Sequence, residues 1–192
     1  MKNKKNKKII IFASSEGTNA EEIIKYFKNK EGISVELVIT NNNNAGVLKR
    51  AKKHSIPSIS YNNEAFEKKL VFEILNLLSP DLIVLAGFLR KIPNIIISKF
   101  PNKIINIHPA LLPKHGGKGM YGEAVHKSVI KSCDSETGIT IHFINRNYDE
   151  GEIIFQKSLK VEAKDSPKSL FRRVQKLEHK YYPLIIEKLL NE

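Results

Sequence analysis

Short apolar runs alternate with stretches of helical periodicity throughout the first half of this chain. The apolar runs lack regular polar alternation, which is typical of strands buried on both faces of a sheet. Strands of this kind, separated by helices, predict a parallel sheet that helices cover on both faces. The expected strands are residues 9–13, 35–40, 82–86 and 104–108. The expected helices are residues 19–28, 45–54, 64–78 and 93–99.

The second half of the chain has a different pattern. A loop rich in glycine and proline is expected at residues 109–122, followed by a short helix at 123–131. Residues 138–145 and 153–161 predict the two strands of an antiparallel hairpin. The last helix begins near Ser166 and Pro167, a polar N-cap followed by proline, and extends to about Leu190.

Pro183 predicts a kink or break within this last helix. The predicted fold class is therefore α/β: a mostly parallel twisted sheet with helices on both faces, a C-terminal antiparallel hairpin and a terminal helix.

The charge of the chain leaves nucleic-acid binding open as a rival interpretation. The 192 residues fit a single domain, residues 9–192, preceded by a basic arm at residues 1–8, and the formal net charge is +12. A basic surface attracts anions of many kinds. Outside the arm the lysines are spread along the chain, and no aromatic residues alternate with those of the arm, as a single-strand binding surface requires. We therefore expect a solvated arm, and nucleic-acid binding is the less favoured of the two interpretations.

Cysteine content and the short apolar runs limit where such a chain can reside. Cys133 is the only cysteine, so there is no disulfide framework and no cysteine-based zinc site. The histidines lack the spacing of a metal site, and we expect no catalytic metal. The longest apolar run near the N-terminus, residues 9–13, is too short for a signal peptide or a membrane span. These features predict a cytoplasmic protein without a membrane partner.

Polar residues follow the carboxyl ends of the expected strands, the edge at which parallel sheets bind ligands. Gly17, Thr18 and Asn19 connect the first strand to the first helix, where backbone amides and the helix dipole favour an anion. A tight turn with an N-cap explains these residues equally well. Glu16 counts against a phosphate unless its carboxylate points to solvent, because like charges repel.

Asn106 and His108 lie two positions apart on an expected strand, so they project from the same face. Histidine transfers protons near neutral pH, and an amide donates hydrogen bonds to a developing oxyanion. Asp149 lies in a turn farther along the chain, and a carboxylate beside a histidine raises the pKa of the imidazole. A hydrogen-bonded structural histidine and an ordinary turn aspartate fit the same residues, and spacing alone does not establish a contact between them.

Four ordered segments resemble the formyl transferase family over nearly the whole chain. They are LAGFLR at 85–90, NIHPALLP at 106–113, TGITIHF at 137–143 and DEG at 149–151. The resemblance implies that the chain transfers the formyl group of 10-formyltetrahydrofolate, its co-substrate, to the amine of 5-phosphoribosylglycinamide in purine synthesis. It also implies direct attack by the amine, without a metal ion and without a formyl-enzyme.

The resemblance assigns roles to three sets of residues. The catalytic set is Asn106, His108 and Asp149. The substrate-binding set is Gly17, Thr18, Asn19, Gln175 and Glu178. The cofactor-binding set is Leu89, Arg90, Lys91, Ile92 and Asn106.

The chain departs from the family pattern at two places. Ser15 stands where glycine is usual, and residues 63–68 lie where some members have a folate-contacting arginine for which this chain offers only lysines. Members that act on methionyl-tRNA or hydrolyse formyltetrahydrofolate carry a further domain, for which this chain leaves no room. The expected partners are therefore the two small-molecule substrates, with assembly as a monomer or a homodimer left open.

Overall fold

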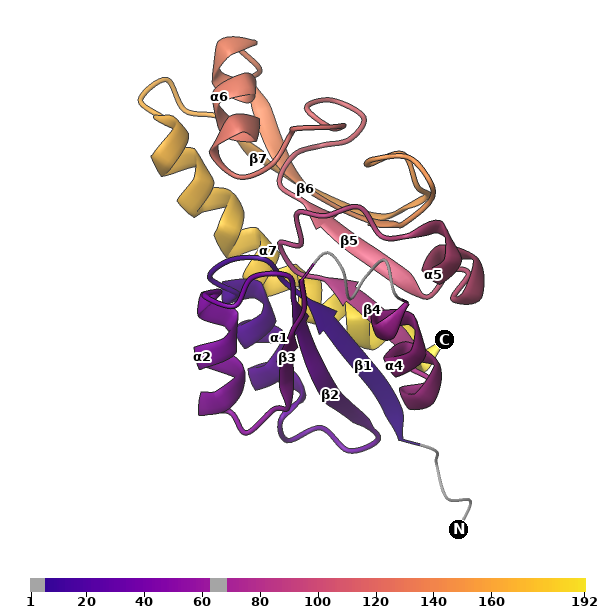
Figure 1. The fold of residues 1–192 in the computed structure, drawn as a ribbon. Helices are drawn as coiled ribbons and strands as arrows, with labels where there is room; N and C mark the ends of the chain where they lie inside the picture. Colours follow the sequence, from indigo (N-terminus) through magenta and orange to yellow (C-terminus); the bar gives the residue numbers. More distant parts are fainter. Residues whose placement is uncertain (1–5, 63–68) are drawn as a thin grey trace.

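The computed structural model describes residues 6–62 and 69–192, which form one seven-stranded sheet in the order β3-β2-β1-β4-β5-β6-β7 (Figure 1). Strands β1 to β5 pair in parallel, whereas β6 pairs antiparallel with both β5 and β7. The strand order reverses between β1 and β4, as in doubly wound, Rossmann-like sheets. The strands are β1 (Lys7–Phe12), β2 (Ile33–Thr40), β3 (Ser58–Ser60), β4 (Leu82–Leu85), β5 (Ile104–His108), β6 (Glu136–Phe143) and β7 (Ile153–Lys160).

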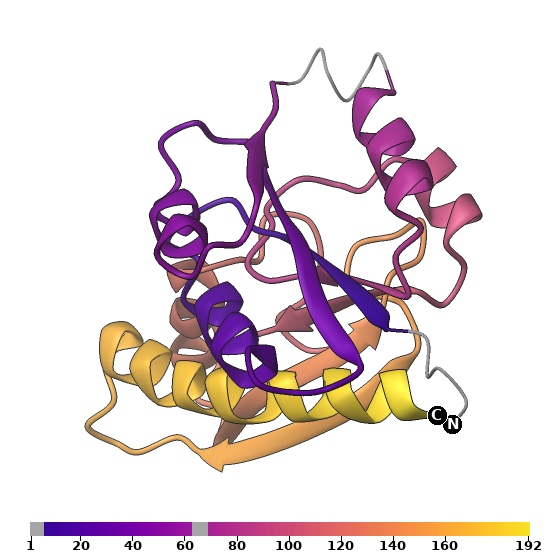
Figure 2. The ribbon, with the colours of Figure 1, turned by 90° about the horizontal axis from the view of Figure 1, so that it is seen from below.

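Helices cover both faces of this sheet (Figures 1 and 2). One apolar cluster joins the sheet to α1, α2, α6 and α7, and a second joins it to α4 and α5. The predicted fold class is confirmed, including the C-terminal hairpin and the terminal helix. The helices are α1 (Thr18–Phe27), α2 (Gly46–Lys53), α4 (Leu70–Leu78), α5 (Asn94–Lys99), α6 (Glu123–Lys131) and α7 (Pro167–Asn191).

Strand β1 explains why the apolar runs are continuous. Ile9 and Ile11 belong to the cluster under α1 and α7, whereas Ile10 and Phe12 belong to the cluster under α4 and α5. All four side chains are fully buried. Burial of each such side chain contributes roughly 1.5–3 kcal/mol, so both faces of the strand select apolar residues.

Strand β3 was missed because it is a three-residue edge strand of sequence Ser-Ile-Ser, too short and polar for an apolar pattern. The predicted third helix is present from Leu70, and the part of the prediction that covers residues 63–68 lies outside the described residues. Pro183 does not break α7, which continues to Asn191 with Pro183 buried in its interior.

Strand β1 begins at Lys7, two residues earlier than expected. Lys7 pairs with Ile33 on β2, and the backbone amide of Lys8 donates a 2.9 Å hydrogen bond to Asp81. These two lysines therefore belong to the sheet, while residues 1–5 of the predicted arm lie outside the described residues. Among the described residues, none of the helices is long and apolar enough to span a membrane.

Helix α7 begins at a well-formed cap and crosses one face of the sheet beside α1 (Figure 2). The Ser166 side chain accepts a hydrogen bond from the Ser169 amide, and Pro167 occupies the first helical position, as predicted. Farther along, the buried Tyr182 hydroxyl lies 3.0 Å from the Leu85 carbonyl oxygen and 3.3 Å from that of Ile105. The helix is thus anchored to β4 and β5 near the end at which ligands bind.

Candidate active site

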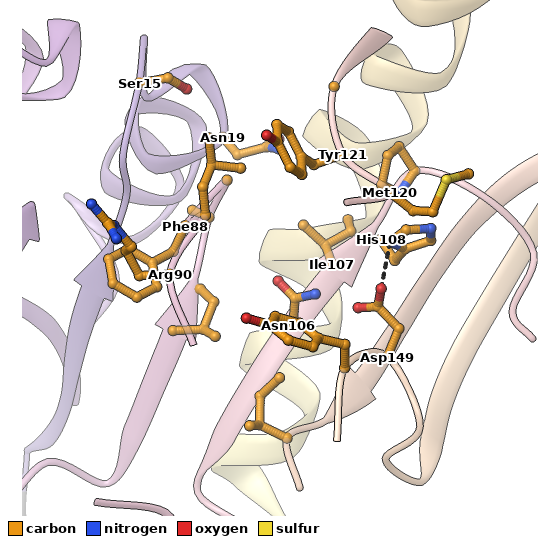
Figure 3. A pocket seen from close by; sticks show the side chains of 18 of the residues that line it. Ser15, Asn19, Phe88, Arg90, Asn106, Ile107, His108, Met120, Tyr121 and Asp149 are labelled. Atoms are coloured by element: carbon orange, nitrogen blue, oxygen red, sulfur yellow. Dashed lines mark ion pairs between the residues drawn. The ribbon is translucent and has the colours of Figure 1, made fainter. Parts of the chain in front are cut away.

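A cleft of about 660 Å³ opens at the carboxyl ends of β1, β4 and β5, where the strand order reverses (Figure 3). Its walls come from the loops after these strands, the loop before α6, the turn between β6 and β7, and one side of α7. All the residues of the three predicted sets line this cleft. The structure therefore brings together residues that lie up to 161 positions apart in the sequence, from Gly17 to Glu178.

The loop after β1 delivers the start of α1 to the cleft. Gly17 has a φ of 71° at the N-cap, and a Cβ atom there would lie 2.4 Å from Val47 Cγ2, so both backbone and packing require glycine. A side chain does not cap this helix start within the described structure. Amides left open at a helix N-terminus bind anions, so the first turn of α1 can receive a phosphate.

Helix α7 completes the same end of the cleft. Gln175 Nε2 lies 3.2 Å from Thr18 Oγ1, and Asn19 Nδ2 donates a 2.9 Å hydrogen bond to Glu178 Oε2. Burial raises the pKa of Glu178 from 4.5 to about 7, although the bond from Asn19 acts in the opposite direction. Four of the five predicted substrate-binding residues therefore form two contacting pairs between the first and last helices.

Helix α2 supports the loop from behind. Arg50 Nε donates a 2.7 Å hydrogen bond to the Glu16 carbonyl, and the Val47 amide donates one of 3.2 Å to the Ser15 carbonyl. Ser15 and Glu16 are exposed, and the Glu16 carboxylate lies against Gly46 in the first turn of α2. A carboxylate in that position is stabilised by the dipole of α2. The departure at Ser15 therefore alters an exposed position of the loop.

The segment after β4 forms the opposite wall. Its turn is fixed by Ser14, whose amide bonds the Gly87 carbonyl at 3.0 Å and whose hydroxyl accepts a 2.9 Å bond from the Leu89 amide. Leu89, Arg90 and Lys91 are exposed at the edge of the cleft, whereas Ile92 is buried. This wall can therefore offer an apolar side chain and two cations to a flat, partly anionic ligand. Residues 63–68, where the sequence offers only lysines in place of a second folate-contacting arginine, lie outside the described residues.

His108 closes β5 and is almost fully buried. Its Nε2 lies 2.8 Å from the His115 carbonyl oxygen, and its Nδ1 lies 3.5 Å from Asp149 Oδ2 (Figure 3). Burial lowers the pKa of His108, while Asp149 and the His115 carbonyl raise it, and burial prevails. Asp149 raises the pKa of His108 as expected, but the net shift of that pKa is downward. The imidazole is therefore neutral near pH 7 in the protein without ligand.

Asp149 lies in the turn between β6 and β7, with a φ of 56°. Its Oδ2 accepts a 3.0 Å hydrogen bond from the Gly117 amide, which ties the loop before α6 to the turn. Burial raises the pKa of Asp149, but His142, His108 and the Gly117 amide outweigh burial and leave the pKa below its usual value. The carboxylate is therefore ionised beside His108.

His142 is a cluster member that reasoning from the sequence did not assign. It lies opposite Asn106 in the pairing of β5 with β6, and its Nδ1 donates to the Phe143 carbonyl at 2.9 Å. When the ring is neutral, its Nε2 can therefore accept a hydrogen bond from the Asn106 amide nitrogen at 3.2 Å. The same nitrogen lies 3.6 Å from Asp149 Oδ1. The register of β5 against β6 pairs Asn106 with His142, and knowledge of this register would have identified His142 as part of the site.

Asn106 is held in a defined orientation by this contact. Its side-chain nitrogen has two hydrogens, of which one bonds His142. The other remains for a ligand in the cleft, which Asn106 lines together with His108 (Figure 3). A hydrogen-bond donor next to a buried imidazole is an arrangement suited to stabilising a tetrahedral oxyanion. Among residues 6–62 and 69–192, no three histidine, cysteine or carboxylate side chains are grouped as a metal site requires.

The cleft at the strand-order reversal has an uncapped helix N-terminus at one end and an amide–imidazole–carboxylate cluster at the other, an arrangement suited to group transfer. A family model described as "Formyl transferase" matches residues 7–186. The chain belongs to the formyl transferase family.

Two named bacterial relatives align with this chain over most of their length. The chain is 36% identical over 190 residues to the phosphoribosylglycinamide formyltransferase of Bacillus subtilis, covering 96% of this chain and 95% of the relative. It is 34% identical over 185 residues to the Escherichia coli protein of the same name, covering 93% and 84%. The crystal structure of phosphoribosylglycinamide formyltransferase from Bacillus halodurans superimposes with a TM-score of 0.87 at 33% identity, covering 97% of this chain and 96% of that one.

Proposed function

We propose that this protein transfers the formyl group of 10-formyltetrahydrofolate to the amine of 5-phosphoribosylglycinamide, a step of purine synthesis. The observation that carries this proposal is the convergence, in one cleft, of an uncapped helix N-terminus with Asn106, His108 and Asp149. A phosphate bound at the helix start and a carbonyl bound at Asn106 and His108 suit a substrate that carries its phosphate at one end and its reacting amine at the other.

The two ends of the cleft suit the two substrates. Gly17, Thr18 and Asn19 would hold the phosphate, while Gln175 and Glu178 would contact the ribosylglycinamide. Gln175 and Glu178 lie within hydrogen-bonding distance of Thr18 and Asn19, which supports the assignment of both pairs to the same substrate. The folate would lie along the opposite wall. Its binding residues are Leu89, Arg90, Lys91, Ile92 and Asn106.

The chemistry is a direct transfer. The substrate amine attacks the formyl carbon, the carbonyl becomes an oxyanion, and the amine nitrogen becomes cationic. Collapse breaks the bond to the folate nitrogen, which takes up a proton as the amine loses one, giving the formylated amide and tetrahydrofolate. Holding both substrates in one cleft supplies a large part of the rate, because it replaces a bimolecular encounter.

Asn106 and His108 act on the developing oxyanion. The free N–H of Asn106 donates a hydrogen bond to the oxyanion. The negative charge of the oxyanion raises the pKa of His108 and so favours the imidazolium. The positive charge of His108 then favours loss of the proton from the amine, which passes to the departing nitrogen. Asp149, ionised and 3.5 Å from Nδ1, orients the ring and stabilises its charged form. No step in this scheme needs a metal ion.

The catalytic unit is the single domain, predicted at residues 9–192 and beginning with β1 at Lys7, and it acts in the cytoplasm as a monomer or a homodimer. The exposed, unpaired Cys133 fits a reducing compartment.

The decisive assay mixes the protein with 10-formyltetrahydrofolate and 5-phosphoribosylglycinamide and follows the release of tetrahydrofolate. We expect release that depends on the amine and is lost in His108→Ala. Release of tetrahydrofolate without the amine would identify a hydrolase of the formylfolate. No release, with or without the amine, would exclude formyl transfer to this substrate. Lys127→Met, on the exposed side of α6, serves as a control with parental activity.

A further inference from the structure

His115, in the loop between β5 and α6, is held by both of its ring nitrogens. Nδ1 lies 2.9 Å from Ser128 Oγ on α6, and Nε2 lies 2.8 Å from Asp134 Oδ2 just beyond that helix. The side chains of His115 and Asp134 are only 10% and 18% exposed. A carboxylate can only accept a hydrogen bond, so Nε2 carries a proton and the neutral ring accepts at Nδ1 from the Ser128 hydroxyl.

The backbone of the same residue contacts the catalytic histidine. The His115 carbonyl oxygen accepts the 2.8 Å hydrogen bond from His108 Nε2. His115 has a φ of 55°, a left-handed conformation that costs a residue other than glycine about 1 kcal/mol or more. The two ring contacts offset this cost, and they hold the carbonyl where His108 needs it.

The groups around His108 show why the His115 carbonyl matters for the orientation of the His108 ring. Its charged and titratable neighbours are Asp149 in the turn after β6, His142 on β6, His126 on α6 and the ring of His115 itself. Within the described part of the chain, the His115 carbonyl is the hydrogen-bond partner of the His108 ring. It binds the proton at Nε2 and thereby leaves Nδ1 toward Asp149.

We propose that His115 is a positioning residue for His108: its ring, clamped between Ser128 and Asp134, fixes the carbonyl that sets the orientation and the Nε2-protonated tautomer of the catalytic histidine. The proposal deepens the proposed function and rests on the role of His108 in formyl transfer.

Ring nitrogen NMR of the substrate-free protein tests the positioning itself. The variants are His115→Asn, which tolerates a left-handed backbone but cannot span both partners, and Asp134→Asn, which leaves the His115 ring in place. In the parent we expect the nitrogen shifts of His108 to report protonation at Nε2. In both variants we expect a mixture of tautomers and a changed titration midpoint of His108. Unchanged shifts and an unchanged midpoint in both variants, with the fold intact, would overturn the proposal.

Kinetics provide the second readout. We expect kcat to fall roughly tenfold or more in His115→Asn and Asp134→Asn, with both KM values within about twofold of the parent, because the substrate contacts remain. Lys114→Met removes the other, exposed partner of Asp134 and should match the parent. A rise in KM at unchanged kcat would also overturn the positioning role. If the parent transfers no formyl group while the NMR changes appear, the proposed function fails and the positioning of His108 stands.

Discussion

Asn19 donates a 2.9 Å hydrogen bond to Glu178 and thereby joins the start of α1 to α7 inside the cleft. The bond satisfies one carboxyl oxygen of Glu178, a residue that is only 9% exposed. Burial of this group raises its pKa to about 7, so near neutral pH a substantial fraction of the protein carries Glu178 as the neutral acid.

Glu178 should therefore make stability depend on pH. Between pH 4.5 and about 7 the folded protein keeps this proton, whereas an unfolded glutamate has released it, so stability falls as pH rises through that window. The loss is on the order of 3 kcal/mol by the top of the window. Glu178→Gln should remove this slope, as measured by denaturant unfolding at several pH values. The exposed Glu31→Gln should retain it, and a parental slope in Glu178→Gln would contradict the prediction.

Asp149→Asn should shift the titration of His108 to lower pH. Asp149 raises the pKa of His108 against the larger effect of burial, so removing the carboxylate leaves burial opposed only by the hydrogen bond to the His115 carbonyl. The inflection assigned to His108 in the kcat/KM profile should move downward, and kcat should fall on the order of a hundredfold or more. An inflection at the parental pH would remove Asp149 from the control of His108.

Asn106→Ala should lower kcat by roughly 100- to 1000-fold, the usual cost of losing one oxyanion donor. His142→Phe tests how that donor is oriented, because it removes the acceptor that holds the Asn106 amide at 3.2 Å. We expect a smaller loss in kcat, on the order of tenfold, and little further effect in the double variant. Additive losses in a double-mutant cycle would show that His142 acts independently of Asn106.

Arg50→Gln should weaken binding of the phosphate-bearing substrate. Arg50 bonds both the Glu16 carbonyl and the buried Glu21 carboxylate, so it braces the loop that presents the start of α1. We expect KM for that substrate to rise about tenfold while KM for the folate stays within about twofold. Lys52→Gln, an exposed neighbour on α2, is the matched control, and equal effects on both KM values would argue against a role in the loop.

Much of the fold could be predicted from the sequence because both faces of the central strands are buried. That burial produces the continuous apolar runs of β1, β2 and β4, and Ser166 followed by Pro167 marks the start of α7. Strand β3 escaped detection because an edge strand of three residues, two of them serine, needs no apolar run.

The site was predicted only in part, and the reason is that its remaining members depend on tertiary contacts. Asn106 and His108 could be placed on one face from their spacing alone. His142 became visible through the register of β6 against β5, and Arg50 through the packing of α2 behind the loop. The net pKa shift of His108 could not be predicted either, because its direction depends on how deeply the imidazole is buried.

The anchoring of α7 by Tyr182 and Glu178 has a consequence for biogenesis. The ribosome makes the strands and loops of the cleft first, yet Gln175 and Glu178 reach the start of α1 only after α7 has emerged and docked. A nascent chain that lacks this helix has a partly formed sheet and no complete substrate site. Ligand-binding competence should therefore appear only once α7 has docked against α1 and the sheet, later than the formation of the strands that carry the catalytic cluster.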